Sequence, residues 1–258
     1  MNWRKRKREN DEVMPWYTNK TAIVTGSTRG IGLETARVLL GGGGNVVIFC
    51  RHKGHGKEAA QKLKASAEGG SAFGGKSSKL KVTYGDVRKI DDIKRIIQEA
   101  ADAFGGVDIL INNAGVAVFK DIEETSDQEY DEVLDTNLKG AFLFTREVLP
   151  MMKKQNRGRI LNISSGLGLQ AKAKYSVYCS SKFGLIGLTQ VTADEVKDTN
   201  IVCVAIAPGG VATKLHLEVH PWEDPSTMMQ PDYIGETIVK KTLLERPPRN
   251  GSTIEIYS

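Results

Sequence analysis

The chain has 258 residues, of which 40% are hydrophobic and 26% charged, and its formal net charge is +5. A hydrophobic share of this size is ordinary for a protein with a buried core, so the composition excludes a wholly disordered chain. No apolar run approaches the roughly 18 residues that cross a bilayer, so we expect no transmembrane helix and no membrane partner.

The N-terminal region carries the whole net charge, because the run Arg4–Arg8 contains five positive residues. Polar and acidic residues, Asn10–Glu12, follow where a signal peptide would have its apolar stretch, so we expect a cytoplasmic protein. We predict that residues 1–19 form a disordered extension and that residues 20–258 form one domain. The charges of that domain balance, so we expect no nucleic-acid partner beyond weak contacts of the basic tail.

From Lys20 onward, short β-branched segments alternate with longer amphipathic ones. The short segments predict buried parallel strands at Thr21–Thr25, Val46–Cys50, Lys81–Tyr84, Val107–Asn112, Arg159–Ile163, Ile201–Ile206 and Thr253–Tyr257. The longer segments predict helices at Ile31–Leu40, Lys57–Ala67, Ile90–Phe104, about Gln128–Gln155, Tyr175–Lys197 and Asp232–Leu244. This alternation predicts a single-domain α/β fold, a Rossmann-like doubly wound parallel sheet of about seven strands with helices on both faces.

Two segments do not fit the alternation. Ser66–Lys79 is rich in glycine, serine and lysine and predicts a flexible excursion before the third strand. Lys214–Gln230 follows the sixth strand and has no steady period. It is either a lid that closes over a substrate or an ordinary surface connection.

A glycine-rich turn, Thr25–Gly32, joins the first strand to the first helix. Gly26 permits a tight turn, Gly30 lets the N-terminus of the helix approach a pyrophosphate, and Gly32 lets the helix pack closely on the strand. Glycine is common in turns, so the trio alone is weak evidence. Its place between a strand and a helix near the start of the domain predicts a nucleotide site.

A second motif, Tyr178 and Lys182, places two side chains four residues apart on one face of a predicted helix. A phenol has a pKa of about 10 and is a poor base at neutral pH. A neighbouring ammonium favours the phenolate, and so does the positive charge of an oxidised cofactor in the nucleotide site. We therefore expect Lys182 and such a cofactor together to lower the pKa of Tyr178 and to make it a proton donor or acceptor. Without further context, a pair at this spacing is usually structural.

Several motifs occur together in one order along the chain: Thr25-Gly26-x-x-x-Gly30-x-Gly32, Asp86-Val87, Asn112-Asn113-Ala114-Gly115, Asn137, Ser165, Tyr178-x-x-x-Lys182 and Pro208-Gly209. In these motifs the chain, from about Lys20 to its end, resembles the short-chain dehydrogenase/reductase family in its common single-domain branch. It is similar to 3-oxoacyl-[acyl-carrier-protein] reductases, which share this motif set.

The resemblance implies four catalytic residues: Asn137, Ser165, Tyr178 and Lys182. Ser165 would donate a hydrogen bond to the substrate oxygen, and the family's usual separation from the tyrosine selects it over Ser164. Asn137 would hold a water that links Lys182 to solvent. The alternative for Asn137 is a polar residue that caps or kinks a helix.

The resemblance also implies cofactor contacts that begin at the glycine turn and end beyond the sixth strand. They are Gly26, Ser27, Thr28, Arg29, Gly30, Ile31, Gly32, Arg51, Asp86, Val87, Asn113, Ala114, Gly115, Tyr178, Lys182, Pro208, Gly209, Val211 and Thr213. The second strand ends without the carboxylate that would accept from a ribose 2′-hydroxyl, and Arg51 can pair with a 2′-phosphate. Because Arg29 adds a second cation, we expect NADP(H) as the cofactor.

We expect no metal, because hydride transfer to a polarised carbonyl needs only the cofactor. Two histidine pairs, His52/His55 and His216/His220, have ligand-like spacing, but we expect neither pair to have an acidic or cysteine partner and interpret them as loop or surface residues. The cysteines form no ligand pattern and are expected to stay reduced: Cys50, Cys179 and Cys203.

The sequence therefore predicts an NADPH-dependent oxidoreductase that reduces a carbonyl, such as a ketone or a 3-oxoacyl thioester, with Tyr178 as proton donor. Two alternatives stay open: an alcohol, sugar or steroid dehydrogenase working in the oxidative direction, and a non-catalytic nucleotide-binding regulator. We expect a homo-oligomer, a dimer or tetramer. Val116, Gly166 and Leu167, together with the segment after Thr213, are expected to shape the substrate pocket.

Overall fold

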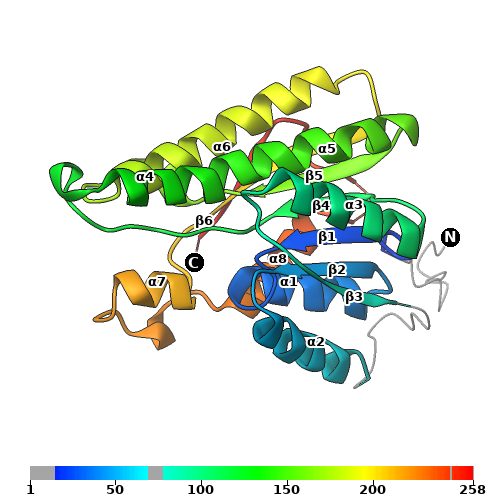
Figure 1. Cartoon of the computed structure of the whole chain (residues 1–258), viewed down its shortest axis with the longest axis horizontal. Helices are drawn as coiled ribbons and strands as arrows, with labels where there is room; N and C mark the ends of the chain where they lie inside the picture. The colour runs from blue at the N-terminus through cyan, green and yellow to red at the C-terminus, as the bar shows by residue number, and fades with distance from the viewer. Residues whose placement is uncertain (1–14, 69–77, 245, 258) are drawn as a thin grey trace, which may run out of the picture.

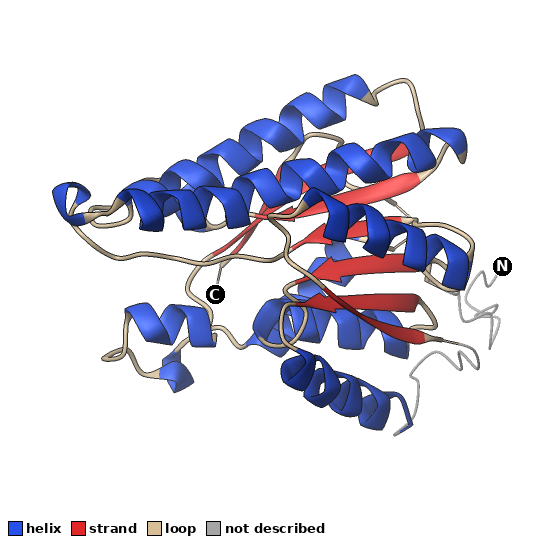
Figure 2. Cartoon of the chain, in the orientation of Figure 1, coloured by secondary structure: helices blue, strands red, loops and turns tan. Residues whose placement is uncertain are grey.

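The sheet is parallel throughout and reverses its strand order near the middle. The computed structural model describes residues 15–68, 78–244 and 246–257, and this part of the chain contains one sheet in the order β3-β2-β1-β4-β5-β6-β7 (Figure 2). The strands are β1 (Thr21–Thr25), β2 (Asn45–Cys50), β3 (Leu80–Tyr84), β4 (Ile109–Asn112), β5 (Gly158–Ile163), β6 (Ile201–Pro208) and β7 (Thr253–Ile256). The order reverses between β1 and β4, so a ligand site is expected at the carboxyl ends of these two strands.

The helices cover both faces of the sheet, as Figure 1 shows. They are α1 (Gly30–Gly41), α2 (Lys53–Glu68), α3 (Ile90–Phe104), α4 (Asp127–Leu134), α5 (Gly140–Lys154), α6 (Ser176–Glu195), α7 (Lys214–Val219) and α8 (Pro231–Thr242). One hydrophobic core joins the sheet to α1, α2 and α8, and a second joins it to α3, α5 and α6. In β1, Val24 belongs to the first core and Ile23 to the second, which is the alternation of a strand buried on both faces. The predicted fold class is confirmed.

The long helix predicted at Gln128–Gln155 is interrupted. A π-helical turn, Asp135–Lys139, separates α4 from α5. Such turns often occur at functional sites, and this one places Asn137 with only 2% of its surface exposed. The amphipathic pattern predicted helix on both sides of the turn but carried no sign of the wider turn.

The folded domain begins earlier than the predicted boundary at Lys20. Tyr17 is 2% exposed and belongs to the first core, and its ring occupies the space that a Cβ at Gly42 would need. Trp16 stacks under the guanidinium of Arg159, 3.8 Å from ring centre to Cζ. Most of the predicted extension lies outside the described residues, as does the centre of the predicted excursion at Ser66–Lys79.

The segment Lys214–Gln230 contains α7 and a short 3-10 turn, Pro225–Thr227, that sequence periodicity did not predict. Figure 1 shows α7 beyond the carboxyl ends of the strands. Thr213 starts this helix, because its hydroxyl oxygen accepts a hydrogen bond from the backbone N–H of His216. No helix in the described ranges is long and apolar enough to span a bilayer.

Candidate active site

The turn after β1 brings three segments into close contact. Gly26 has a φ of 61°, and a Cβ at this position would lie 2.8 Å from Cα of Ala114. The side chain of Asn113 donates to the carbonyl oxygens of Thr25 and Gly26, which fixes the end of β4 against the turn. A Cβ at Gly32 would lie 2.4 Å from Nδ2 of Asn113, so both glycines are required sterically.

The N-terminus of α1 is available to an anion. Its N-cap residue is Arg29, which makes no side-chain capping hydrogen bond. The first N–H groups of a helix have no partner within the helix, and the helix dipole adds positive potential there. This end of α1 is therefore suited to the pyrophosphate of a dinucleotide.

One cavity of about 1040 Å³ runs along the carboxyl ends of the strands. Nearly all predicted cofactor residues line it: Gly26, Thr28, Arg29, Gly30, Ile31, Arg51, Asp86, Val87, Asn113, Ala114, Gly115, Tyr178, Lys182, Pro208, Gly209, Val211 and Thr213. A cavity of this size, with the steric clearance at Gly26, fits a dinucleotide and a small substrate side by side.

Two predicted cofactor residues do not line the cavity. Ser27 is fully buried, and its hydroxyl oxygen accepts from the backbone N–H of Phe49, so its side chain ties the glycine turn to β2. Gly32 packs against Asn113 instead. These two residues therefore shape the glycine turn and do not line the cavity.

Two cations line the cavity, one directly after β2 and one in the glycine turn after β1. Arg51 and Arg29 are both exposed and both line it. The carboxyl of Asp86 is partly buried, which acts to raise its pKa, but hydrogen bonds from Arg88 and the charge of Arg51 lower the pKa below its ordinary value. Arg51 therefore lies close enough to the Asp86 carboxylate to act on its charge, at the edge of the cavity where β2 and β3 end.

Tyr178 and Lys182 face the cavity from successive turns of α6. The Lys182 ammonium is buried and donates to the carbonyl oxygen of Ile163 at 2.7 Å. It lies 5.6 Å from the centre of the Tyr178 ring. Tyr178 also has a hydrogen bond with Ser165, whose hydroxyl oxygen accepts from the N–H of Leu167. The end of β5 and the first turns of α6 thus bring these three predicted side chains together.

Asn137 supports this group from behind the cavity. Its amide exchanges two hydrogen bonds with the backbone of Val116, each of 2.9 Å, and donates a third to Ser181. A Cβ at Gly115 would lie 3.5 Å from Oδ1 of Asn137 and 3.7 Å from Nζ of Lys182. Position 115 therefore lies beside both the amide of Asn137 and the ammonium of Lys182.

In the protein without cofactor the pKa of Tyr178 is raised, so the expected lowering by two neighbouring positive charges stays a prediction for the cofactor-bound protein. Burial raises the pKa of Tyr178 to about 12, and the hydrogen bond with Ser165 offsets only part of this rise. Burial lowers the pKa of Lys182 to about 8. Desolvation disfavours both charged forms and is the largest cause of each shift. At neutral pH the phenol therefore keeps its proton, which is the form that a proton donor needs.

Sequence reasoning missed several residues at the open end of the cavity. Tyr175 and Tyr257 line it together with Gln170, beside the predicted Gly166 and Leu167. Tyr175 is 6% exposed and contacts the rings of Phe119 and His220. No sequence pattern indicated that these residues line the cavity, because they are far apart along the chain. Only the folded sheet brings β7, α6 and the segment after β6 to one edge.

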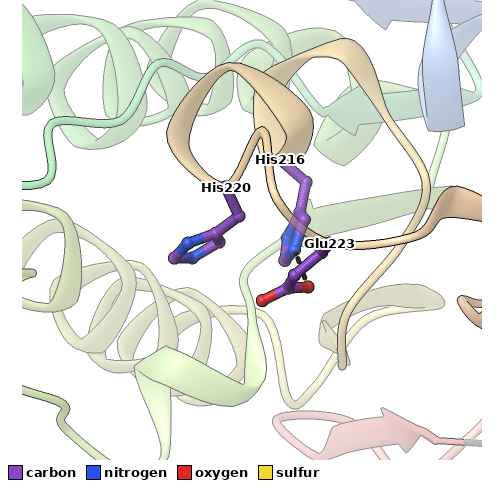
Figure 3. Close-up of side chains that lie close together, drawn as sticks. All are labelled: His216, His220 and Glu223. Carbon is purple, nitrogen blue, oxygen red and sulfur yellow. Dashed lines mark hydrogen bonds and ion pairs between the residues drawn. The ribbon is translucent and has the colours of Figure 1, made fainter.

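The interpretation of His216 and His220 as surface residues without an acidic partner is also wrong. His220 is 5% exposed, and Nε2 of His216 lies 2.8 Å from a carboxylate oxygen of Glu223 (Figure 3). The other pair, His52 and His55, is exposed, and its ring centres are 5.5 Å apart.

Comparisons with known proteins agree with this geometry. A family model described as short chain dehydrogenase matches residues 20–224. The chain belongs to the short-chain dehydrogenase family. It is therefore an oxidoreductase that acts on CH–OH or C=O groups and uses a nicotinamide cofactor.

Two relatives and one solved structure show how close the similarity is. The chain is 39% identical to a D-beta-hydroxybutyrate dehydrogenase of Cupriavidus necator over 76% of this chain and 72% of that one. It is 35% identical to a 3-oxoacyl-[acyl-carrier-protein] reductase of Staphylococcus epidermidis over 76% of this chain and 77% of that one. A variant of the actinorhodin polyketide ketoreductase, crystallised with NADPH, superposes with a TM-score of 0.82 at 28% identity, covering 92% and 95% of the two chains. The predicted family resemblance is confirmed.

Proposed function

We propose that this short-chain dehydrogenase reduces a carbonyl to an alcohol with NADPH, and that Tyr178 donates the proton. The observation that carries the proposal is the joint placement of Tyr178, Ser165 and Lys182 in the cavity that begins at the glycine turn. A carbonyl that accepts a hydride at its carbon needs a proton and a hydrogen-bond donor at its oxygen, and these side chains can supply both.

A reduced nicotinamide bound in this cavity would supply the hydride to the carbonyl carbon. The side chains act on the oxygen: Ser165 donates a hydrogen bond to it, and the phenol of Tyr178 releases its proton to it as negative charge develops. The Lys182 ammonium stabilises the phenolate that remains. A phenol with a pKa of about 12 gives up its proton only to a more basic oxygen, and an alkoxide is one.

The preference for NADPH rests on charge at the end of β2. Arg51 lines the cavity there, Arg29 lines it from the glycine turn, and the strand ends without an acidic residue. A 2′-phosphate would form charge-assisted hydrogen bonds with either guanidinium, whereas the carboxylate typical of NAD-binding sites would repel it. The relation to a ketoreductase crystallised with NADPH supports the same assignment.

The main alternative is oxidation of a hydroxy acid, and the relative named D-beta-hydroxybutyrate dehydrogenase favours it. Oxidation requires the phenolate as base, and the raised pKa of Tyr178 disfavours that form in the free protein. We therefore place reduction first. A 3-oxoacyl thioester is the first substrate to try, given the similarity to 3-oxoacyl-[acyl-carrier-protein] reductases.

The test combines binding and turnover. We expect NADPH to raise the melting temperature more than NADH does, and NADPH absorbance to fall when ketones and 3-oxoacyl thioesters are supplied. Faster NAD reduction with hydroxy acids would favour the dehydrogenase alternative. Cofactor binding without turnover of any substrate in either direction would favour a nucleotide-binding regulator.

A further inference from the structure

Three metal-ligating side chains meet in the segment Lys214–Gln230, outside the proposed catalytic group. His216 lies on α7, His220 directly follows this helix, and Glu223 lies in the loop after it (Figure 3). One ligand atom from each residue lies within 4.8 Å of the other two. The spacing places the two imidazoles one helical turn apart, and the chain reversal after α7 brings the carboxylate back to them.

The buried imidazole of His220 has one nitrogen without a partner. Its Nε2 forms a hydrogen bond with the hydroxyl of Tyr175, whereas its Nδ1 is buried and makes no hydrogen bond. An unpaired buried polar atom is costly, and an ion that is bound in the working protein is one standard explanation. Metal-bound histidines typically donate their other N–H to a neighbouring acceptor, and Tyr175 is placed to accept from Nε2.

The ligand set matches a particular class of metal. Two imidazoles and one carboxylate, with a fourth position open, form a typical site for Zn²⁺ or a similar first-row divalent ion. Ligand atoms about 2 Å from such an ion lie up to about 4 Å from each other, so binding needs only small side-chain rotations from the present separation. The carboxylate of Glu223 offsets part of the ion's charge. The exposed ammonium of Lys172 acts on both His220 and Glu223 and opposes binding, but water screens it.

We propose that His216, His220 and Glu223 bind a divalent transition-metal ion such as Zn²⁺, with Tyr175 as the outer partner that orients His220. All three ligands line the cavity, so the fourth position is open to water or to an oxygen of a bound molecule. The ion joins α7 to the loop that follows it and, through Tyr175, to the start of α6. The proposal concerns the segment Lys214–Gln230 and stands whether or not carbonyl reduction is the activity.

The test measures metal binding directly on the full chain after removal of metal with a chelator and without cofactor. We expect one equivalent of Zn²⁺ to bind in competition with a chromophoric chelator. Co²⁺ in its place should give the strong visible absorption of a four-coordinate site. Circular dichroism and the melting temperature of each metal-free variant show whether it is folded.

The second histidine pair, His52 and His55, provides a matched control for the proposed metal ligands. Glu223→Gln and His216→Ala should each weaken Zn²⁺ binding by at least about 10-fold, and Tyr175→Phe by about 10-fold or more. The double variant His52→Ala/His55→Ala should bind Zn²⁺ as the native chain does. The proposal is overturned if the native chain binds no Zn²⁺ under these conditions. It is equally overturned if folded Glu223→Gln keeps native affinity and spectrum, or if only the control variant loses them.

Discussion

At the scale of single residues, burial decides which protonation state the catalytic side chains adopt. The phenol of Tyr178 has its pKa raised to about 12 and the ammonium of Lys182 has its pKa lowered to about 8, each by desolvation. The sequence placed the two side chains on one helix face, but it did not show how deeply they are buried. The sign of the shift on the phenol followed from burial, so only the structure revealed it.

These shifts predict opposite pH dependences for the two reaction directions. For reduction, the phenol stays protonated up to about pH 12, while Lys182 loses its charge as the pH rises through about 8. We expect kcat/KM for a ketone to be level below pH 8 and to fall above it. Because oxidation releases the proton that reduction consumes, kcat/KM for alcohol oxidation should rise up to about pH 8 and level off above it. Initial rates in both directions across this range check this. A reduction rate that climbs above pH 8 would contradict the assignment of a neutral phenol.

Arg51→Asp should exchange the cofactor preference. The substitution removes a charge-assisted hydrogen bond to the 2′-phosphate and adds repulsion, which should lower kcat/KM for NADPH by about 10- to 100-fold. The new carboxylate can accept from the ribose hydroxyls of NADH, so kcat/KM for NADH should rise. Lys53→Asp is the matched control, because it makes the same charge change on an exposed neighbour that does not line the cavity. An unchanged ratio of NADPH to NADH activity in Arg51→Asp would refute the charge argument.

Among the secondary-structure elements, the π-helical turn between α4 and α5 directs the side-chain amide of Asn137 into the protein interior. Asn137 makes three hydrogen bonds, two to Val116 and one to Ser181, and they connect the turn to the loop after β4 and to α6. The sequence predicted this residue only through its family resemblance. Amphipathic periodicity cannot reveal a single wider turn, because the pattern on each side of it is still helical.

Asn137→Ala should therefore cost stability as well as activity. The change leaves Val116 and Ser181 with unpaired groups, and each buried group left unpaired costs about 1–3 kcal/mol, so we expect a loss of about 2–4 kcal/mol. Urea denaturation measures the loss, and Asn200→Ala, at an exposed position, is the control. A native midpoint for Asn137→Ala would show that these hydrogen bonds do not hold the site together.

The burial and length of each element decided whether the sequence predicted it. Strands buried on both faces, such as β1 at Thr21–Thr25, have continuous β-branched runs, and their bounds followed from the sequence. The helix α7 did not, because its six residues are too few to show a period and its start depends on the cap at Thr213. The residues that surround the substrate end come from segments far apart in the chain, so their meeting was visible only in the structure.

At the scale of the whole molecule, α5 and α6 present exposed aromatic side chains on the outer layer. Gly184 lets α6 approach the π-helical turn, since a Cβ there would lie 2.8 Å from a methyl carbon of Leu138. Phe183, beside this glycine, is 44% exposed, and Phe142, one turn beyond Leu138, is 46% exposed. Two exposed aromatic rings beside the contact between α6 and the π-helical turn indicate a protein interface, and a second copy of the chain is the expected partner.

The double variant Phe142→Glu/Phe183→Glu should be monomeric where the native chain is a dimer or tetramer. In a self-complementary interface the introduced glutamates of the two copies would be buried close together, and their like charges would repel each other. Light scattering after size exclusion measures the mass, and Tyr233→Glu, an exposed aromatic on α8 across the sheet, is the control. A native chain that is already monomeric, or a double variant that still associates, would contradict this prediction. The cytoplasmic location and the role of the basic run Arg4–Arg8 stay predictions, the latter outside the described residues.

Tyr175 and Tyr178, at the start of α6, can be compared in the NADPH-dependent reduction of a ketone. Tyr178→Phe removes the proton donor and should lower kcat by about 10²- to 10⁴-fold, while NADPH still raises the melting temperature as in the native chain. Tyr175→Phe removes a hydroxyl that contacts His220 instead, so its loss of kcat should be far smaller. Native turnover by Tyr178→Phe, or an equal loss in both variants, would contradict the assignment of Tyr178 as the proton donor.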